Sequence, residues 1–181
     1  MLRCFLLPAI LMLPVLARCQ EMSLRKGFSH YHRITAVMAY DFIPAAEGID
    51  TQTGLYVVPV WGLGYDYWLT PHLALGLHGD MAIQKYEVRF EEKVITRSHP
   101  IKISLAGMYK ISKHWVVFAG GGREYERSID FWVVSFGTEY NIEIDRTWEV
   151  NFNLAYTGKL GAYDSALFGI GFSKKLGERD E

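Results

Sequence analysis

Cysteine is nearly absent from this chain, which holds only Cys4 and Cys19 among its 181 residues. Both lie in an N-terminal segment that we expect to be cleaved off during export. The chain that remains would contain no cysteine, so a disulfide framework of the kind that staples many small exported domains is excluded. Another source of stability has to hold the fold together.

The sequence also lacks a second long apolar run, a basic patch and, after residue 27, clear helix patterns. No later segment reaches the length of a transmembrane helix. Subtracting the two arginines of the N-terminal segment from the 19 basic residues leaves 17 against 20 acidic residues. This balance gives no indication of nucleic-acid binding. The length allows one domain with a sizeable core.

The first nineteen residues have the layout of a secretory signal peptide. A short basic start is followed by the apolar run CFLLPAILMLPVL, which Pro8 and Pro14 interrupt and which is too short to span a bilayer. Small residues then precede Gln20, so we predict a signal peptide over 1–19. Two alternatives stay open: an N-terminal membrane anchor, and lipoprotein processing at Cys19, although Arg18 stands where a lipobox has a small residue.

The rest of the chain shows repeated period-two alternation of apolar and polar residues, which is typical of β-strands. Tight polar turns alternate with longer connections at about 44–53, 91–98 and 158–163, as in an up-and-down antiparallel meander. About twenty residues per strand and connection fit strands that cross a membrane at a tilt. The predicted strands cover roughly 30–43, 54–69, 73–90, 99–111, 115–126, 130–144, 148–158 and 163–174.

The two faces of these strands differ in a way that indicates a membrane barrel. In the stretch 54–69, Leu63 and Tyr65 share one face, whereas Gly62, Gly64 and Asp66 share the other. A solvated sheet face would carry many Lys, Glu and Thr, but small residues with a few charges suit the narrow interior of an eight-stranded barrel. We therefore expect the apolar face to point outward, toward lipid. Pro59 in this strand predicts a local irregularity, because proline cannot donate to a ladder.

Aromatic residues cluster where the apolar rows end, as expected of two headgroup-level belts. Large aromatics also fill ordinary cores, which is the alternative explanation. The belt beside the tight turns would contain Tyr65, Tyr67, Tyr109, Trp115, Tyr140 and Trp148. The belt near the longer loops would contain Tyr40, Phe42, Tyr86, Phe90, Tyr125, Trp132, Tyr156 and Tyr163.

The stretches WGLGYDYWLTPHLALGLHGD, MYKISKHWVVFAGGG and ALFGIGFSKKL, together with the signal peptide, resemble small outer-membrane β-barrel proteins. This is the OmpA-like or OmpX-like superfamily of eight-stranded barrels in Gram-negative envelopes. The resemblance implies a monomer in the outer membrane, contact with its lipid and lipopolysaccharide, and insertion by the barrel-assembly machinery. One departure concerns assembly, since such proteins usually end on an aromatic residue, whereas Phe172 is followed by SKKLGERDE.

We divide the chain into a signal peptide (1–19), an N-terminal leader (20–28), an outer-membrane barrel (29–176) and a charged C-terminal tail (177–181). The fold class is all-β, an eight-stranded antiparallel up-and-down transmembrane barrel. The tight turns and the N-terminus are expected on the periplasmic side. The phase of the first strand and of the strand VVFAGGGREYE stays open.

Ionisable residues on the predicted inner face are best explained as a network of ion pairs and hydrogen bonds that fills a narrow lumen, because a buried charge has to be paired or solvated. The alternative is a proton or ion path, which needs a continuous water-filled lumen. These residues are Arg33, Asp41, Asp66, His78, Asp80, Lys102, Lys110, Glu139 and Glu149.

Three groups of residues could in principle carry hydrolytic chemistry, which needs a base within hydrogen-bond reach of a nucleophile. Some small outer-membrane barrels are lipid A deacylases or acyltransferases, so a lipid-modifying enzyme is the second hypothesis. No short motif supports these groups, and we predict no catalytic residue. The groups are His78 with Asp80 and Ser104, His99 with Ser98, and Ser128 with Asp130.

Two further patterns are weaker. His30 and His32 share a strand face, but two ligands are too few for a metal site. The run GGGRE at 120–124 lacks the strand-to-helix context of a phosphate loop, and glycines in a strand more often mark close packing at a barrel wall. We predict no metal and no cofactor. The expected role is structural or surface-interacting; a secreted lipocalin-like binder is the third hypothesis.

Overall fold

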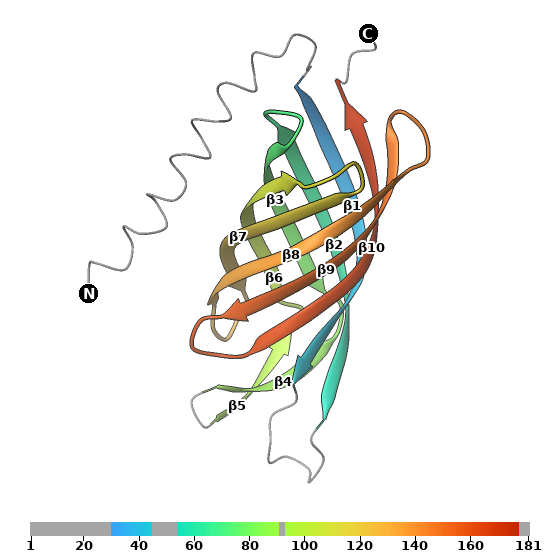
Figure 1. The fold of residues 1–181 in the computed structure, drawn as a ribbon. Helices are drawn as coiled ribbons and strands as arrows, with labels where there is room; N and C mark the ends of the chain where they lie inside the picture. Colours follow the sequence, from blue (N-terminus) through green and yellow to red (C-terminus); the bar gives the residue numbers. More distant parts are fainter. Residues whose placement is uncertain (1–29, 45–53, 91–92, 178–181) are drawn as a thin grey trace, which may run out of the picture.

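The structure is a computed structural model that describes residues 30–44, 54–90 and 93–177. Ten antiparallel strands make up nearly all of this part (Figure 1). Among the described residues no helix is long and apolar enough to cross a membrane. The strands are β1 (Tyr31–Pro44), β2 (Leu55–Trp68), β3 (Leu73–Ala82), β4 (Lys85–Phe90), β5 (Lys93–Ser98), β6 (Ile101–Lys110), β7 (Trp115–Tyr125), β8 (Phe131–Glu143), β9 (Trp148–Lys159) and β10 (Asp164–Leu176).

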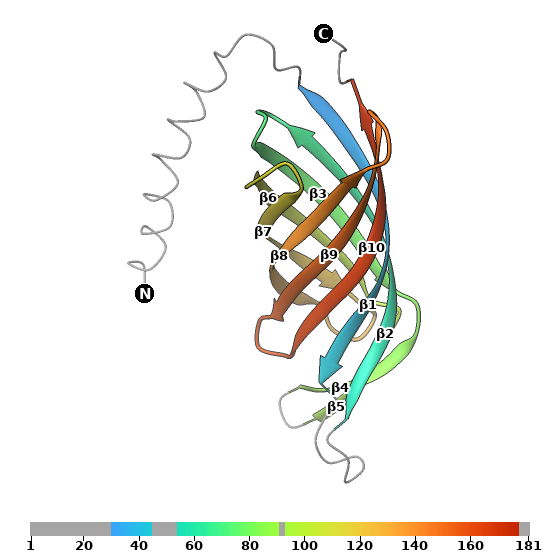
Figure 2. The same cartoon turned by 45° about the vertical axis from the view of Figure 1, so that its right-hand side comes forward.

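Eight of the strands close into one barrel in the order β1-β10-β9-β8-β7-β6-β3-β2. Each strand pairs antiparallel with its neighbour, and β1 with β10 closes the cylinder, from His32 opposite Leu176 to Phe42 opposite Ala166. The tight turns lie at one end of the barrel, beside the start of β1 and the end of β10 (Figure 2). The predicted eight-stranded up-and-down barrel is therefore confirmed. Closure gives each of the eight barrel strands two partners, so the barrel itself has no open edge.

The predicted strand over 73–90 is wrong in one respect: the chain leaves the barrel wall in its middle. β3 ends at Ala82, whose N–H donates to the carbonyl of Pro100 at 3.1 Å, and β4 begins at Lys85. β4 then pairs with β5, which lies in a segment that we expected to be a loop. The β-branched run Val94-Ile95-Thr96 in that segment favours a strand, so a β4–β5 hairpin forms across the loop end of the barrel (Figure 1).

Pro59 causes no irregularity in β2, contrary to the prediction. It lies opposite Tyr40 of β1 in an unbroken strand, and its carbonyl accepts a hydrogen bond from the N–H of Ile83 at 2.9 Å. The N–H and C=O of one strand residue point to the same side, so the missing donor faces β3 rather than β1. β3 ends opposite Val60. The proline therefore lies just beyond the paired ladder, where no donor is needed.

The two strands of open phase are settled by burial. In β1 the odd-numbered residues, such as Arg33 and Thr35, face inward, and in β7 the even-numbered ones do, among them Val116 and Glu124. The signal peptide (1–19), the leader (20–28) and residues 178–181 of the tail lie outside the described residues. Their boundaries stay predictions.

Candidate functional site

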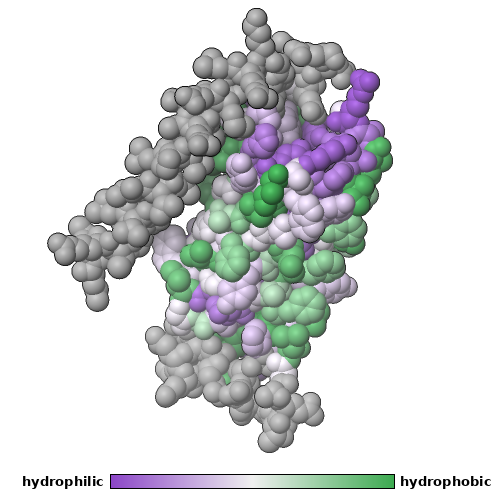
Figure 3. Space-filling model, in the orientation of Figure 1, coloured by the Kyte–Doolittle hydropathy of each residue, from purple (hydrophilic) through white to green (hydrophobic). Residues whose placement is uncertain are grey.

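The outer surface of the barrel wall is apolar. Large hydrophobic side chains are exposed on all eight barrel strands, and Leu63 on β2 and Leu105 on β6 are each 68% exposed. In Figure 3 hydrophobic residues lie over the middle of the wall, and hydrophilic ones gather at the end with the tight turns. Exposed apolar surface of this extent marks contact with an apolar partner rather than with water.

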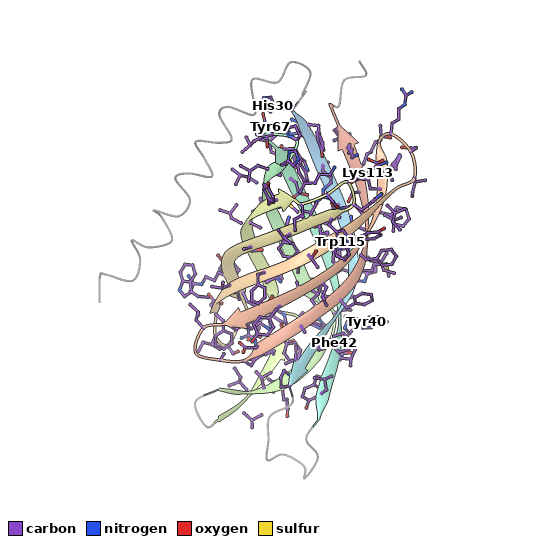
Figure 4. The ribbon with its side chains drawn as sticks, viewed as in Figure 1. His30, Tyr40, Phe42, Tyr67, Lys113 and Trp115 are labelled. Atoms are coloured by element: carbon purple, nitrogen blue, oxygen red, sulfur yellow. The ribbon has the colours of Figure 1, made fainter. Side chains whose placement is uncertain are left out.

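Aromatic residues form a belt at each end of this apolar wall, as predicted. The turn-side belt contains Tyr65, Tyr109, Trp115 and Trp148, all exposed, with Tyr67 and Tyr140 half-buried. The loop-side belt contains Tyr40, Tyr125, Trp132 and Tyr156, all exposed, with Phe42 half-buried. Figure 4 shows Tyr40 and Phe42 far from His30 and Tyr67, toward the opposite end of the barrel.

Two predicted members of the loop-side belt, Tyr86 and Tyr163, are placed wrongly. Both are buried, at 4% and 8% exposure, and their hydroxyls lie 2.8 Å apart. The reason is the β4–β5 hairpin, which carries Tyr86 over the mouth of the barrel and covers Tyr163 instead of continuing the wall. The side chain of Phe90 lies outside the described residues.

The predicted network of inward charges is confirmed in the turn-side half of the lumen. Arg33 Nε lies 2.8 Å from Asp66 Oδ2, and its Nη2 lies 2.9 Å from Glu139 Oε2. These three groups come from β1, β2 and β8 and are nearly solvent-free. The guanidinium serves two carboxylates at once, which is how a buried charge is compensated.

A second set of polar contacts continues this network toward the tight turns. Lys175 Nζ lies 2.8 Å from Glu149 Oε1 and 3.4 Å from Glu143 Oε1. Further along β9 from the tight turn, Asn151 and Asn153 are joined by a side-chain hydrogen bond of 2.7 Å. Side chains thus fill this half of the lumen.

The middle of the lumen holds a cavity of about 80 Å³, lined by His78, Asp80, Lys102 and Ser104 among others. Asp80 Oδ2 and Lys102 Nζ are 2.9 Å apart and also line a smaller cavity of about 20 Å³ toward the mouth. A volume of about 10–15 Å³ holds one water molecule, so the larger cavity is sized for several waters and the smaller one for one or two. The ion pair separates them.

The β4–β5 hairpin closes the loop-side mouth. Arg97 of β5 is fully buried, and its Nη2 lies 2.7 Å from Glu124 Oε1 of β7. Lys159 of β9 reaches the other oxygen of the same carboxylate at 3.2 Å. The guanidinium also lies over the ring of Phe131, 4.8 Å from its centroid. The Glu124 carboxylate therefore joins the hairpin, through Arg97, to the barrel wall, where it also pairs with Lys159 of the neighbouring part of the lumen.

Burial has direct electrostatic consequences at this mouth. It raises the pKa of Tyr86 and of Tyr163 well above the usual range of a phenol, and the carboxylate of Glu124 adds to the effect. For Arg97 burial lowers the pKa, but Glu124 more than offsets it, so the pKa of the guanidinium lies above its ordinary value. The phenols stay neutral and the guanidinium stays charged at neutral pH.

An apolar cluster also covers the loop-side mouth. Val88 of the hairpin is fully buried, as are Ile43 at the end of β1 and Val58 on β2. Phe131 and Tyr163 pack in the same cluster. Covering the mouth with these side chains shields the ion pairs below from water.

None of the three candidate catalytic groups assembles. His78 Nε2 bonds to Asp66 Oδ1 at 2.8 Å, while Asp80 pairs with Lys102, so these two side chains engage other partners. Ser104 lies opposite His78 in the register, yet no hydrogen bond joins the two side chains among the described residues. Among the described residues, the candidate nucleophile Ser104 and the candidate base His78 are therefore not coupled.

The two candidate pairs at the rim have structural roles instead. His99 takes a left-handed backbone conformation between β5 and β6, and its Nδ1 lies 3.3 Å from the Ala82 carbonyl rather than on Ser98. Ser128 donates from its N–H and its hydroxyl to Glu126. Asp130 accepts from the Glu126 N–H at 3.1 Å. These contacts shape the β5–β6 and β7–β8 connections.

His30 and His32 lie at the turn-side rim on the outer side. His32 Nδ1 lies 2.7 Å from the Tyr65 hydroxyl, and its ring stacks on Tyr67 with centroids 4.9 Å apart. Within the described residues no three His, Cys, Asp or Glu side chains come together as a metal site would require. The geometry thus explains both imidazoles as aromatic-belt partners.

The glycines of the run 120–124 serve close packing, as interpreted from the sequence. A Cβ on Gly120 would collide with the backbone of Leu105 and Ala106, and one on Gly122 would collide with Ile103. Both glycines face the lumen from the middle of β7, where the β6 backbone comes too near for any side chain.

All nine predicted inward ionisable residues do lie on the lumen side, but sequence reasoning missed further buried charges among the described residues. Glu124 was missed because the phase of its strand was open. Lys159 and Lys175 each lie one residue beyond a predicted strand end, where continued alternation was the available signal. Arg97 was assigned to a loop. It shares a strand face with Ile95, but an alternation this short does not indicate burial.

Comparison with known proteins supports the architecture of this chain but does not assign it to a family. No protein-family model and no curated protein matches the chain. Among solved structures, Ail, the attachment invasion locus protein of Yersinia pestis in complex with the heparin analogue sucrose octasulfate, superposes with a TM-score of 0.54 at 10% identity, over 82% of this chain and 100% of Ail. Neisserial surface protein A superposes with a TM-score of 0.53 at 10% identity, over 81% of this chain and 97% of its own.

At such identities the likeness concerns the fold alone. The closed cylinder of eight antiparallel strands, apolar outside and charged inside, is the architecture of small outer-membrane β-barrels.

Proposed function

We propose that this chain is exported through a cleaved signal peptide and inserts into a bacterial outer membrane as a monomeric barrel over residues 29–176. The tight turns face the periplasm, and the longer loops with the β4–β5 hairpin face the cell exterior. The barrel contacts membrane lipid and lipopolysaccharide and depends on the barrel-assembly machinery for insertion. Its role is structural or surface-interacting, through the loop side.

The observation that carries this proposal is the outward row of apolar side chains on every barrel strand, between two aromatic belts. Hydrocarbon offers no hydrogen-bond partner, so a spanning segment must pair all of its backbone groups internally, and closure achieves this for strands. A lipocalin-like binder would need the reverse arrangement, with its apolar face around a central cavity. Here the central side chains are Arg33, Asp66 and Glu139.

The filled lumen argues for an interaction role over a diffusion channel. Ion pairs block the turn-side half, Asp80 and Lys102 separate the two cavities, and the hairpin covers the mouth. A solute path would require several of these contacts to open together.

Fractionation of cells that express the chain tests the proposal. We expect the protein in the outer-membrane fraction, released by detergent but not by salt, and with a gel mobility that shifts on heating, because folded barrels resist unheated detergent. Recovery from the aqueous periplasmic fraction would contradict it. The lipid-modifying alternative has its own test: lipid A mass profiles of cells that express the chain, His78→Gln or His99→Gln should be identical to those of cells without it.

A further inference from the structure

One inward cation of the barrel has no acidic partner. Lys110 ends β6 at the turn side, and its half-buried side chain lies on the lumen face together with Met108. Among the described residues no carboxylate lies within ion-pair distance of its ammonium, although a charge in such surroundings needs a partner. The other inward lysines and arginines are all paired with carboxylates, and these are Arg33, Arg97, Lys102, Lys159 and Lys175.

A second donor without a partner lies beside Lys110. The Nε1–H of Trp68 is buried, and within the part of the chain that the structure describes it has no hydrogen-bond partner. Lys110 Nζ lies 5.8 Å from the centroid of this ring. An aromatic ring compensates an ammonium only in part, and a buried indole N–H ordinarily finds an acceptor. Both donors therefore lack the same kind of partner, an anionic acceptor at the turn-side opening of the lumen.

Two stacked rings connect this place with the end of the last strand. The ring of Trp68 stacks on that of Tyr31, with centroids 5.6 Å apart. Lys175 Nζ of β10 lies 5.9 Å from the centroid of Tyr31 and is satisfied by Glu149 at 2.8 Å. The segment that follows β10 therefore starts at one end of this pair of rings, and Lys110 lies at the other end.

The segment that follows β10 is acidic. Residues 178–181 read Glu-Arg-Asp-Glu and bring three carboxylates against one guanidinium. Four extended residues span about 13 Å, and an acidic side chain adds to this reach. Both the charge and the length of the segment therefore match a partner for Lys110 on the far side of the two rings.

A lysine on the rim is a weaker partner for this segment. Lys113, in the β6–β7 turn, is 68% exposed and already pairs with Glu143 at 3.3 Å. Figure 4 shows it toward the end of the barrel that carries the tight turns. Water compensates an exposed ammonium, so an additional ion pair at Lys113 contributes little. The half-buried and unpaired Lys110 gains more from a carboxylate.

We propose that the acidic segment 178–181 folds over the turn-side opening of the lumen and that one of its carboxylates pairs with Lys110. The ammonium donates to this carboxylate, and the N–H of Trp68 is a second donor at the same place. The contact covers the turn-side opening, as the β4–β5 hairpin covers the loop-side mouth. Segments of the same chain thus close the lumen at both ends, a role that goes beyond the proposed membrane function.

Chemical cross-linking of the folded full chain in detergent micelles tests the contact. A carbodiimide joins a carboxylate to an amine where the two groups touch, and peptide mass spectrometry identifies the joined residues. We expect an amide between Lys110 and an acidic residue of 178–181. This product should be absent from Lys110→Met, whereas the matched control Lys113→Met should keep it. Products that join the segment to rim lysines but not to Lys110 would overturn the inference.

Acetylation rates measure the same contact without a cross-link. In the triple variant Glu178→Gln, Asp180→Asn and Glu181→Gln, which leaves the barrel unchanged, Lys110 should be acetylated about fivefold faster than in the parent chain, as for loss of a solvent-accessible ion pair. The rate at Lys113 should not change. Equal rates at Lys110 in the two chains would refute the contact. If added acetate slows acetylation of Lys110 equally in both chains, an external carboxylate is the occupant and the acidic segment is not.

Discussion

Replacing Arg97 by methionine should release the β4–β5 hairpin from the mouth of the barrel. Its guanidinium side chain is 0% exposed and lies 2.7 Å from Glu124, whose side chain is 6% exposed. Removing one partner of a buried ion pair costs about 3–5 kcal/mol. Lys159 still neutralises Glu124 at 3.2 Å in this variant, so we expect a loss at the lower end, about 3 kcal/mol.

The complementary change, Glu124→Gln, should cost more. It leaves Arg97 and Lys159 facing each other without their shared carboxylate, and two buried like charges repel. The double variant Arg97→Met with Glu124→Gln should lose less than the sum of the single changes, because both members of the pair are removed together and only their other partners, Lys159 and Glu126, lose a contact. The ordering of the three variants is thus fixed by the geometry.

Hydrogen exchange of the hairpin amides measures these differences. An undocked two-stranded hairpin is barely stable in water, so loss of docking should expose the β4–β5 ladder. A local loss of about 3 kcal/mol corresponds to exchange about a hundredfold faster, while amides in the middle of β9 and β10 should not change. Unaltered hairpin exchange in Arg97→Met, or a larger effect there than in Glu124→Gln, would refute the proposed role of the shared carboxylate.

Three further outcomes follow from the wall and the mouth. Leu63→Arg, at the middle of the apolar wall, should destabilise the inserted barrel by about 2–4 kcal/mol in urea unfolding from vesicles; no loss would indicate that this face avoids lipid. Gly120→Ala should lower the free energy of unfolding by about 1–3 kcal/mol, because the added Cβ collides with β6. The control Gly107→Ala, on the outer face, should be neutral in the same assay, because its Cβ would meet its nearest atom at 4.0 Å. Because burial raises the pKa of Tyr86 and Tyr163, the stability that depends on these neutral phenols is present below about pH 10 and lost as the pH rises through their folded-state values. A tyrosinate absorbance titration should therefore show two phenols that ionise last, and both should vanish when Tyr86 and Tyr163 are changed to Phe.

The side of the wall on which a residue lies could be predicted from the sequence because the period of a strand is two. Asp66 and Glu139 are separated widely in the chain, yet each was placed inward by its neighbours of opposite character; Arg33 was also expected inward, although the phase of its strand stayed open. Alternation cannot predict the position of each side chain along the barrel axis, because that position depends on the register between strands. The three-way contact at Arg33 is therefore a result of the structure.

The mouth of the barrel could not be predicted for a different reason. A strand that crosses the wall and a strand that folds over the opening have the same local pattern, so 73–90 was taken as one element. The chain leaves the wall after Ile83, whose N–H still donates to the carbonyl of Pro59, a residue of another strand. Tyr86 was assigned to the lipid-facing belt on the same assumption, and only the tertiary arrangement brings its hydroxyl to Tyr163.

The hairpin also explains why so many charges are compatible with this lumen. Among the described residues, Val88 and Phe131 lie over the mouth, and the lumen below holds cavities of about 80 and 20 Å³. In such surroundings each ion pair is strong but each unpaired ion is costly. In a lumen of this kind every buried charge needs a partner and the mouth has to exclude water. Opening the mouth at Arg97 should therefore also weaken deeper contacts. The ion pair of Asp80 and Lys102, which separates the two cavities, is the first that water would reach.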